Sequence, residues 1–233
     1  KLIVVFFMNN FMFFIKHKIT LNLTYKMLLD NENQHPKVHE WITQYTQSGQ
    51  LSIVTGYFTI GALAWLSRQT NNLINEYRFI LGDIVSFSNE KQADLNLLNE
   101  NITVEGAMNL NRLAKEAVSF LEQEKVITKT MEPNFCHAKL TLFKPENRDA
   151  RLSWFVTGSS NLTEAGIGLK VTQNVELNTP GTGETHPYMS ELSEWFENLW
   201  KNPKTHKTKT ILTETGKKER IDFKTYLINE IKK

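Results

Sequence analysis

The chain has 233 residues, of which 40% are hydrophobic, so it can bury one sizeable core, and this length favours one domain over two. Its single cysteine, Cys136, excludes an internal disulfide, and no group of Cys and His has the spacing of a structural zinc site. We therefore expect a reducing, cytoplasmic location. The net charge of +2 is uneven, because residues 201–233 hold ten Lys or Arg and four Asp or Glu.

The most apolar stretch is LIVVFFMNNFMFFI at residues 2–15. It is shorter than the ~20 residues of a spanning helix, Asn9 and Asn10 divide it, and no small-residue cleavage site of a signal peptide follows. We expect no membrane anchor. Residues 1–24 are interpreted as an N-terminal extension, either a buried or partner-covered strand or translated sequence upstream of a natural start at Met8 or Met27.

The first half of the chain predicts a βαβ unit. Apolar residues from Val38 to Tyr45 fall at helical spacing, and Gly49 can close that helix. A strand is expected over 51–59, a short helix over 62–66, and a second strand over 77–81 that stops at Gly82-Asp83. This alternation indicates an α/β sheet.

The second half predicts further layers on that sheet. Helical periodicity is clearest over 110–121, and strands are expected over 125–128, 135–143, 152–157 and 171–177, with a short helix between the last two. Met189, Leu192, Trp195, Phe196 and Leu199 share one face of a helix that Pro203 ends. The segment KNPKTHKTKT that follows is typical of a linker or a solvated arm. No internal repeat is found.

His137 and Lys139 lie two residues apart in the strand expected over 135–143. Strand alternation therefore puts them on one face, opposite the apolar Cys136, Ala138, Leu140 and Leu142. Taken alone, this pair is more typical of a half-buried histidine and a solvated lysine at a sheet edge.

The segment from Thr157 to Glu164 predicts a strand-to-helix turn. Gly158 permits close backbone approach, and Ser159, Ser160 or Asn161 can cap the helix, whose N-terminal amides favour an anion such as phosphate. Taken alone, the spacing of Asn161 and Glu164 is that of an ordinary capping box.

Together, His137-x-Lys139 and Gly158-Ser159-x-Asn161 resemble the HxK and GSxN signature of the phospholipase D superfamily. The resemblance is greatest to its nuclease-like branch, found in metal-independent restriction endonucleases and at the N-termini of bacterial helicase-like proteins. It spans roughly residues 25–200 and includes three further stretches, Leu29-Asp30-Asn31-Glu32, Thr55-Gly56-Tyr57-Phe58 and Asn174-Val175-Glu176-Leu177-Asn178. It implies an α/β/α sandwich with a central mixed sheet.

The resemblance also implies chemistry without a metal or cofactor. One His137 attacks phosphorus to give a phosphohistidine, and a second histidine protonates the leaving oxygen and then activates water. Lys139 and Asn161, with Ser159 in support, bind the nonbridging oxygens. The fuller family pattern has an Asp where this chain has Lys144, and Glu176 is the natural substitute, ahead of Gln173 or Asn174.

Because the chain has one copy of the motif, the need for a nucleophile and an acid predicts a homodimer with one shared active site. The expected function is DNA cleavage, with a helicase domain as a possible C-terminal partner after the basic segment 201–233. The competing hypotheses are a nucleic-acid-binding module that has lost cleavage, which Lys144 favours, and, with less weight, a phospholipid hydrolase.

Three more residues are candidates for binding substrate, namely Gly158, Ser160 and Tyr57. Tyr57 could stack on a base or pack into the core with nearly equal weight, whereas its neighbour Phe58 is expected in the core. The C-terminal segment is more typical of a solvated helix and linker than of a dedicated DNA-binding arm.

Overall fold

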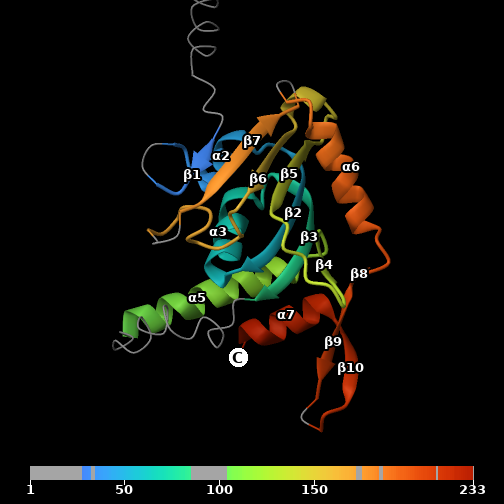
Figure 1. Ribbon diagram of the computed structural model, residues 1–233. Coiled ribbons are helices and arrows are strands. Elements are labelled where there is room, and N and C mark those ends of the chain that lie inside the picture. Colours follow the sequence, from blue (N-terminus) through green and yellow to red (C-terminus); the bar gives the residue numbers. More distant parts are fainter. Residues whose placement is uncertain are drawn as a thin grey trace, which may run out of the picture.

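The computed structural model describes residues 28–32, 35–84, 104–171, 175–183, 186–213 and 215–232, so the expectations for residues 1–24, Gln173 and Asn174 lie outside the described residues. A mixed sheet of eight strands forms the centre, in the order β1-β7-β6-β5-β2-β3-β4-β8 (Figure 1). Its strands are β1 (Leu29–Asp30), β2 (Gly49–Phe58), β3 (Ile74–Ile84), β4 (Val126–Met131), β5 (Leu140–Pro145), β6 (Trp154–Gly158), β7 (Leu177–Thr182) and β8 (Thr205–His206).

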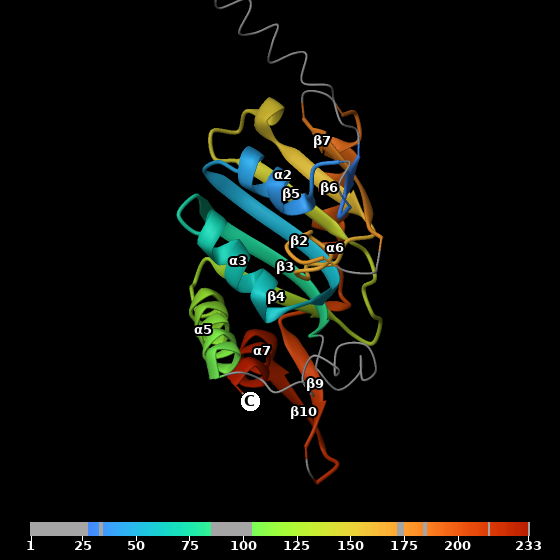
Figure 2. The ribbon, with the colours of Figure 1, turned by 90° about the vertical axis from the view of Figure 1, so that its left-hand side faces the viewer.

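Helices cover both faces of this sheet, which confirms the expected α/β/α sandwich (Figures 1 and 2). The first core holds buried residues of α2 (Val38–Tyr45), α3 (Ile60–Thr70), α5 (Val104–Leu121) and α7 (Phe223–Lys232). The second core lies under α6 (Met189–Trp200). No helix in the described ranges is long and apolar enough to cross a membrane.

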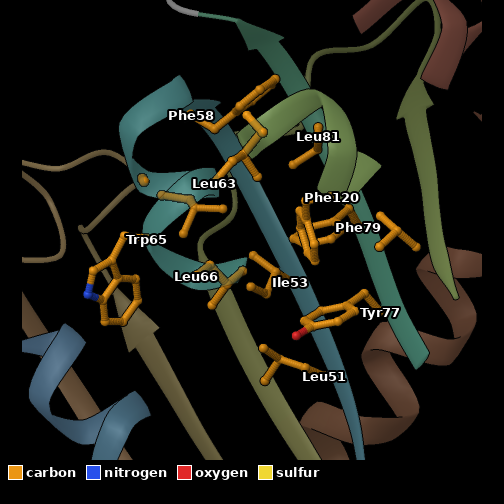
Figure 3. Packing of buried hydrophobic residues seen from close by; sticks show 14 of the residues in the cluster. Leu51, Ile53, Phe58, Leu63, Trp65, Leu66, Tyr77, Phe79, Leu81 and Phe120 are labelled. Atoms are coloured by element: carbon orange, nitrogen blue, oxygen red, sulfur yellow. The ribbon is translucent and has the colours of Figure 1, made fainter. Parts of the chain in front are cut away.

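The first core is built around the parallel pair β2 and β3, which α3 connects. Leu51 and Ile53 of β2 and Phe79 of β3 are buried in it, and Phe79 meets Phe120 of α5 edge to face (Figure 3). Tyr77 is also buried, and its hydroxyl lies 2.7 Å from the Thr70 hydroxyl, so its polar end is satisfied. The parallel pairing of β2 with β3 and the helix α3 between them confirm the predicted βαβ unit.

The second core holds the apolar side chains that flank the candidate histidine. Cys136, Leu140 and Leu142 pack with Met189 and Phe196 of α6, and Ala138 packs against them, as the alternation in 136–142 predicts. Trp195 was expected on the buried face of α6, but it is 41% exposed.

Several boundaries differ from the predictions. The strand expected over 135–143 begins only at Leu140, which pairs with Val54 of β2. Beyond Val54, the chain bonds to another segment instead. Asn161 Oδ1 accepts from Tyr57 N, and Leu162 O accepts from Thr59 N. The strand expected over 171–177 is wrong, since β7 begins at Leu177. Likewise β3 continues past Gly82 to Ile84, and Gly49 begins β2 rather than closing a helix.

The short helix expected after Asn161 is also wrong. Residues 163–170 form successive turns, with the i to i+4 bond from Ile167 N to Thr163 O. Gly168 has φ of 81°, a left-handed conformation that ends a helical path, and its chain returns through the bond from Leu169 N to Glu164 O. A helix N-terminus is therefore not available there as an anion site.

The expectation of a linker or solvated arm after residue 200 is wrong for the described residues. After β8, a hairpin of β9 (Thr208–Leu212) and β10 (Lys218–Asp222) extends beyond the sheet, and α7 folds back beside α5 (Figures 1 and 2). Phe223, Leu227 and Ile231 of α7 belong to the first core. Their i, i+4, i+8 spacing is the signal that the sequence analysis missed.

Candidate active site

All eight site residues expected from the sequence lie in segments that meet at one edge of the sheet. Strand register explains why: Leu140 at the start of β5 pairs with Thr157 near the end of β6, and Gly158 pairs with Asn178 at the start of β7. The loop before β5, the turn after β6 and the segment before β7 therefore converge, beside the end of β2 that carries Tyr57.

His137 and Lys139 are adjacent although they do not lie in a regular strand. The Lys139 ammonium lies 3.0 Å from each ring nitrogen of His137 and donates to the His137 carbonyl oxygen at 2.7 Å. Thr157 Oγ1 donates to the Lys139 carbonyl oxygen at 2.9 Å, which ties this loop to β6. The His137 imidazole is exposed, while its neighbour Cys136 is buried and anchors the loop.

Asn161 is oriented by β2. Its Oδ1 accepts a bond of 3.1 Å from Tyr57 N and lies 3.3 Å from Thr55 Oγ1. These contacts fix the carbonyl end of the amide toward β2, and the Nδ2 end is the part of the side chain that can donate. Asn161 and Lys139 line the same pocket, so an amide donor and a cation face one space.

Ser159 and Glu176 form the third part of the edge. Ser159 Oγ donates to the Glu176 carboxylate and accepts from Leu177 N at 3.0 Å, and Asn31 Oδ1 accepts from Glu176 N at 2.9 Å. Burial lowers the pKa of Lys139 below its usual value, and the charges of Glu176 and Cys136 partly offset that shift. The charge of Glu176 therefore acts on the pKa of Lys139.

Ser160 and Gly158 have structural contacts that the sequence analysis did not foresee. Asn178, which is buried, accepts from Ser160 N at 3.1 Å and donates from Nδ2 to Ser160 Oγ at 2.8 Å, and this hydroxyl donates to Gly166 O at 2.7 Å. A Cβ at Gly158 would lie 2.4 Å from Leu177 O. Ser160 and Gly158 therefore shape the turn on which Asn161 stands.

The sequence analysis assigned no role to three residues of the site, namely Thr55, Phe135 and Asn178. Thr55 and Asn178 lie in two of the stretches on which the family resemblance rests, and both are buried. The available signal was a polar residue within an expected strand, which needs a hydrogen-bond partner once it is buried. Tyr57 is 39% exposed, whereas Phe58 is fully buried as expected.

Lys144, which replaces the Asp of the fuller family pattern, lies away from this edge. It pairs in register with Gln50 at the start of β2, whereas the site is at the end of β2. Its ammonium lies 3.8 Å from the Glu197 carboxylate of α6. The substitution therefore places a charge against α6 rather than near His137.

Chemically, the edge offers an imidazole in contact with an ammonium, an amide that lines a pocket together with that ammonium, and a carboxylate whose charge acts on it. Such a set can hold an oxyanion and present it to the imidazole nitrogen. Within the described ranges, no three His, Cys, Asp or Glu side chains gather as a metal-ligand group would.

Comparisons with known proteins identify the family of the chain. Residues 50–200 match the family model described as the phospholipase D-like domain of cardiolipin synthase. No curated protein matches the chain. Solved structures with a similar fold include the phospholipase D family member Nuc from Salmonella typhimurium, at 11% identity and a TM-score of 0.46, over 77% of this chain and 94% of that one.

Two larger proteins are similar over part of their length. Polyphosphate kinase from Porphyromonas gingivalis has 10% identity and a TM-score of 0.48, and phosphatidylserine synthase from Haemophilus influenzae has 14% identity and a TM-score of 0.47. The alignments cover 87% and 77% of this chain but 27% and 39% of those proteins. With the family model matching more than half of its residues, the chain belongs to the phospholipase D superfamily of phosphodiesterases.

Proposed function

We propose that the chain cleaves DNA phosphodiesters through a phosphohistidine intermediate, without a metal, in an active site shared by two copies. The observation that carries this proposal is the contact of Lys139 Nζ with the His137 ring at 3.0 Å, beside a pocket that Lys139 and Asn161 both line. A nucleophile and two oxyanion-binding groups thus converge where one phosphate would fit.

In the first step, a neutral His137 nitrogen forms a bond to phosphorus while the bond from phosphorus to the leaving oxygen breaks. The protonated His137 of the second copy gives its proton to that oxygen. Water then attacks phosphorus, the phosphorus–nitrogen bond breaks, and the second His137 takes the proton of the water. Lys139 and Asn161 stabilise the charge that grows on the nonbridging oxygens.

The need for a second histidine is the reason for proposing a homodimer, because the chain has one copy of the motif. The surface of the site supports an interface: Val175 and Leu177, on either side of Glu176, are 73% and 56% exposed. Apolar side chains at the rim of a charged site are typical of surfaces that another chain covers.

DNA is proposed as substrate because three stretches resemble the nuclease-like branch, and all of them contribute to this edge. Tyr57 and Thr55 orient Asn161, Asn31 accepts from the backbone of Glu176, and Asn178 holds the turn at Ser160. The same resemblance is the basis for proposing that the chain acts within a larger helicase or restriction-type protein.

The hypothesis of a binding module that has lost cleavage depended on Lys144. That residue contacts Glu197 at 3.8 Å and lies at the far end of β2 from His137. The departure from the family pattern therefore leaves the phosphate-binding edge unchanged, and we favour an active enzyme.

The decisive experiment is cleavage of supercoiled plasmid in excess EDTA by the wild-type chain and by His137→Ala. Nicking by the wild type alone is expected. Nicking by both proteins would exclude His137 as the nucleophile, and loss of wild-type nicking in EDTA would exclude the metal-independent mechanism. Analytical ultracentrifugation of the wild type tests the dimer, and a monomer with full activity would overturn the shared site.

A further inference from the structure

Two aromatic side chains lie at the surface next to His137, and the chemistry described above uses neither of them. The ring centroids of Tyr57 and Phe135 are 5.3 Å apart with an interplanar angle of 44°, and that of Phe135 is 6.3 Å from the His137 ring. Their side chains remain 39% and 45% exposed. Exposed rings in contact with each other at the edge of a polar site form a surface suited to a flat ligand.

Phe135 is seated firmly on the sheet. A Cβ at Gly82 would lie 2.7 Å from the Phe135 ring and 2.0 Å from the Gly56 carbonyl oxygen, and one at Gly56 would lie 3.2 Å from the same ring. The two glycines at the ends of the parallel strands β2 and β3 therefore make room for the ring. Glycine and backbone atoms of β2 and β3 therefore lie against one side of the ring, while the side chain is 45% exposed.

Tyr57 is held by its backbone on both sides. Its N–H donates to Asn161 Oδ1 at 3.1 Å, and its carbonyl oxygen accepts from Thr55 Oγ1 at 2.7 Å. The position of its ring is thereby tied to the amide that would hold the phosphate. The backbone that carries Tyr57 and the Asn161 side chain are thus hydrogen-bonded to each other, so a ligand held at Asn161 would lie close to the aromatic pair.

We propose that Tyr57 and Phe135 are a stacking platform for the nucleobase next to the scissile phosphate, and that the preferred substrate is therefore single-stranded nucleic acid. This inference rests on the proposed function, because it assumes a nucleotide whose phosphate lies at His137. The base faces of a duplex are covered by their neighbours, whereas a single strand presents them to aromatic side chains.

Other occupants fit the surroundings less well. A lipid chain needs an extended apolar groove, but the pair is bordered by polar groups of Asn161, Thr55 and His137. Two rings alone offer less than the several hundred Å² that each copy would bring to a dimer interface, so the interface proposed above does not depend on them. A nucleobase requires only a flat apolar surface of about this size.

The test is binding rather than cleavage, so it does not depend on turnover. In the His137→Asn background, fluorescence anisotropy compares a single-stranded oligonucleotide, an abasic strand of the same length and a duplex. Stacking on one base corresponds to about tenfold or more in affinity, so the single strand should bind at least tenfold more tightly than the abasic strand. The duplex should show no such gain over the abasic strand.

Tyr57→Leu and Phe135→Leu should each lower this ratio toward one, while Phe135→Trp should keep it. Tyr188→Leu is the matched control, because Tyr188 is an exposed aromatic residue that precedes α6 and its ring contacts His186 instead, at 5.0 Å between centroids and 49° between planes. Its ratio should equal that of the His137→Asn parent. Circular dichroism confirms that each variant is folded.

Equal affinity for natural and abasic strands, no binding to any strand, or a ratio that neither substitution changes would overturn the platform. A shift from dimer to monomer in Phe135→Leu, at unchanged ratio, would assign the rings to an interface between copies. If the wild type fails to nick plasmid but the ratio behaves as expected, the cleavage proposal fails and the platform stands.

Discussion

The carboxylate of Glu132, in the loop that leads to His137, accepts two hydrogen bonds from Thr210 of β9, at 2.7 Å from its N–H and 2.9 Å from its hydroxyl. Glu132 N also donates to Lys204 O at 3.0 Å. The C-terminal hairpin, which lies beyond residues 50–200 of the family match, is thus bonded to the loop that carries His137. It is positioned to hold that loop in place.

Thr210→Val removes one of these two bonds and keeps the shape of the side chain. We expect a several-fold fall in kcat with little change in KM, because the loop becomes less well positioned while the phosphate-binding groups remain. Thr210→Ser should restore kcat. Thr213→Val, on the same hairpin, removes a hydroxyl that bonds to Lys217 O and should leave kcat at the wild-type value. Equal effects of both Val variants would refute this positioning role.

The position of Leu227 in the first core gives a prediction about stability. Leu227→Ala deletes fully buried methyl groups and should lower the free energy of unfolding by about 2–5 kcal/mol. Leu212→Ala in the hairpin is the matched control, because that side chain is 70% exposed and its loss should cost about 0.5 kcal/mol or less. Urea unfolding measures both values, and a similar midpoint for the two variants would mean that α7 is not part of the cooperative unit.

Much of this architecture could be predicted from local patterns. The helical period of 38–45 predicted α2, and the apolar runs of β2 and β3 with a short helix between them predicted the βαβ unit. The alternation around His137 predicted the correct buried face even though residues 135–139 are not a strand. The alternation reports which side chains are buried, and that is the same whether or not the backbone bonds to β2. Here the segment 135–139 is not paired with β2, because Asn161 and Leu162 take the hydrogen bonds there.

Contacts between distant segments could not be predicted in this way. Nothing local to Phe135 indicates that Gly56 and Gly82 make room for its ring, and nothing local to Glu132 indicates Thr210 as its partner. The polar, Lys-rich sequence after Pro203 favoured a solvated helix and linker, whereas Phe223, Leu227 and Ile231 of α7 are buried in the first core and Tyr226 and Ile228 pack against it. The roles of the individual site residues remain predictions.

Asn161→Asp tests the donor role of the Asn161 amide while keeping its acceptor role. The new carboxylate can still accept from Tyr57 N, so the fold should be retained, but it has no donor and repels a phosphate. We expect kcat/KM to fall by roughly 10²- to 10³-fold, as for loss of one oxyanion donor. Asn147→Asp is the control, because Asn147 Oδ1 also accepts a backbone N–H, that of Asp149 at 3.0 Å, in a turn after β5. Wild-type rates for Asn161→Asp would exclude the donor role.

The pKa of Lys139 gives a prediction for the pH dependence. Burial lowers this pKa, so the ammonium loses its proton at a lower pH than a free lysine, whose pKa is about 10.4. As the pH rises, activity that needs this cation should therefore be lost before pH reaches about 10.4. Lys139→Arg should move the alkaline limb of kcat/KM upward. Glu176→Gln removes a charge that raises the pKa of Lys139 and should move the limb downward. A limb that stays fixed in both variants would assign it to another group.

Lys144→Asp restores the residue that the fuller family pattern has at this position. Lys144 lies five residues after Lys139, about 15 Å along an extended chain, at the opposite end of β5 from the site. The variant should cleave at the wild-type rate. Its free energy of unfolding should fall by no more than about 1 kcal/mol, because a half-exposed ion pair with Glu197 at 3.8 Å is lost and two like charges face each other. A tenfold rise in kcat/KM would instead show that Lys144 limits the wild-type enzyme. That result would favour the competing hypothesis of a binding module whose cleavage is weakened or lost.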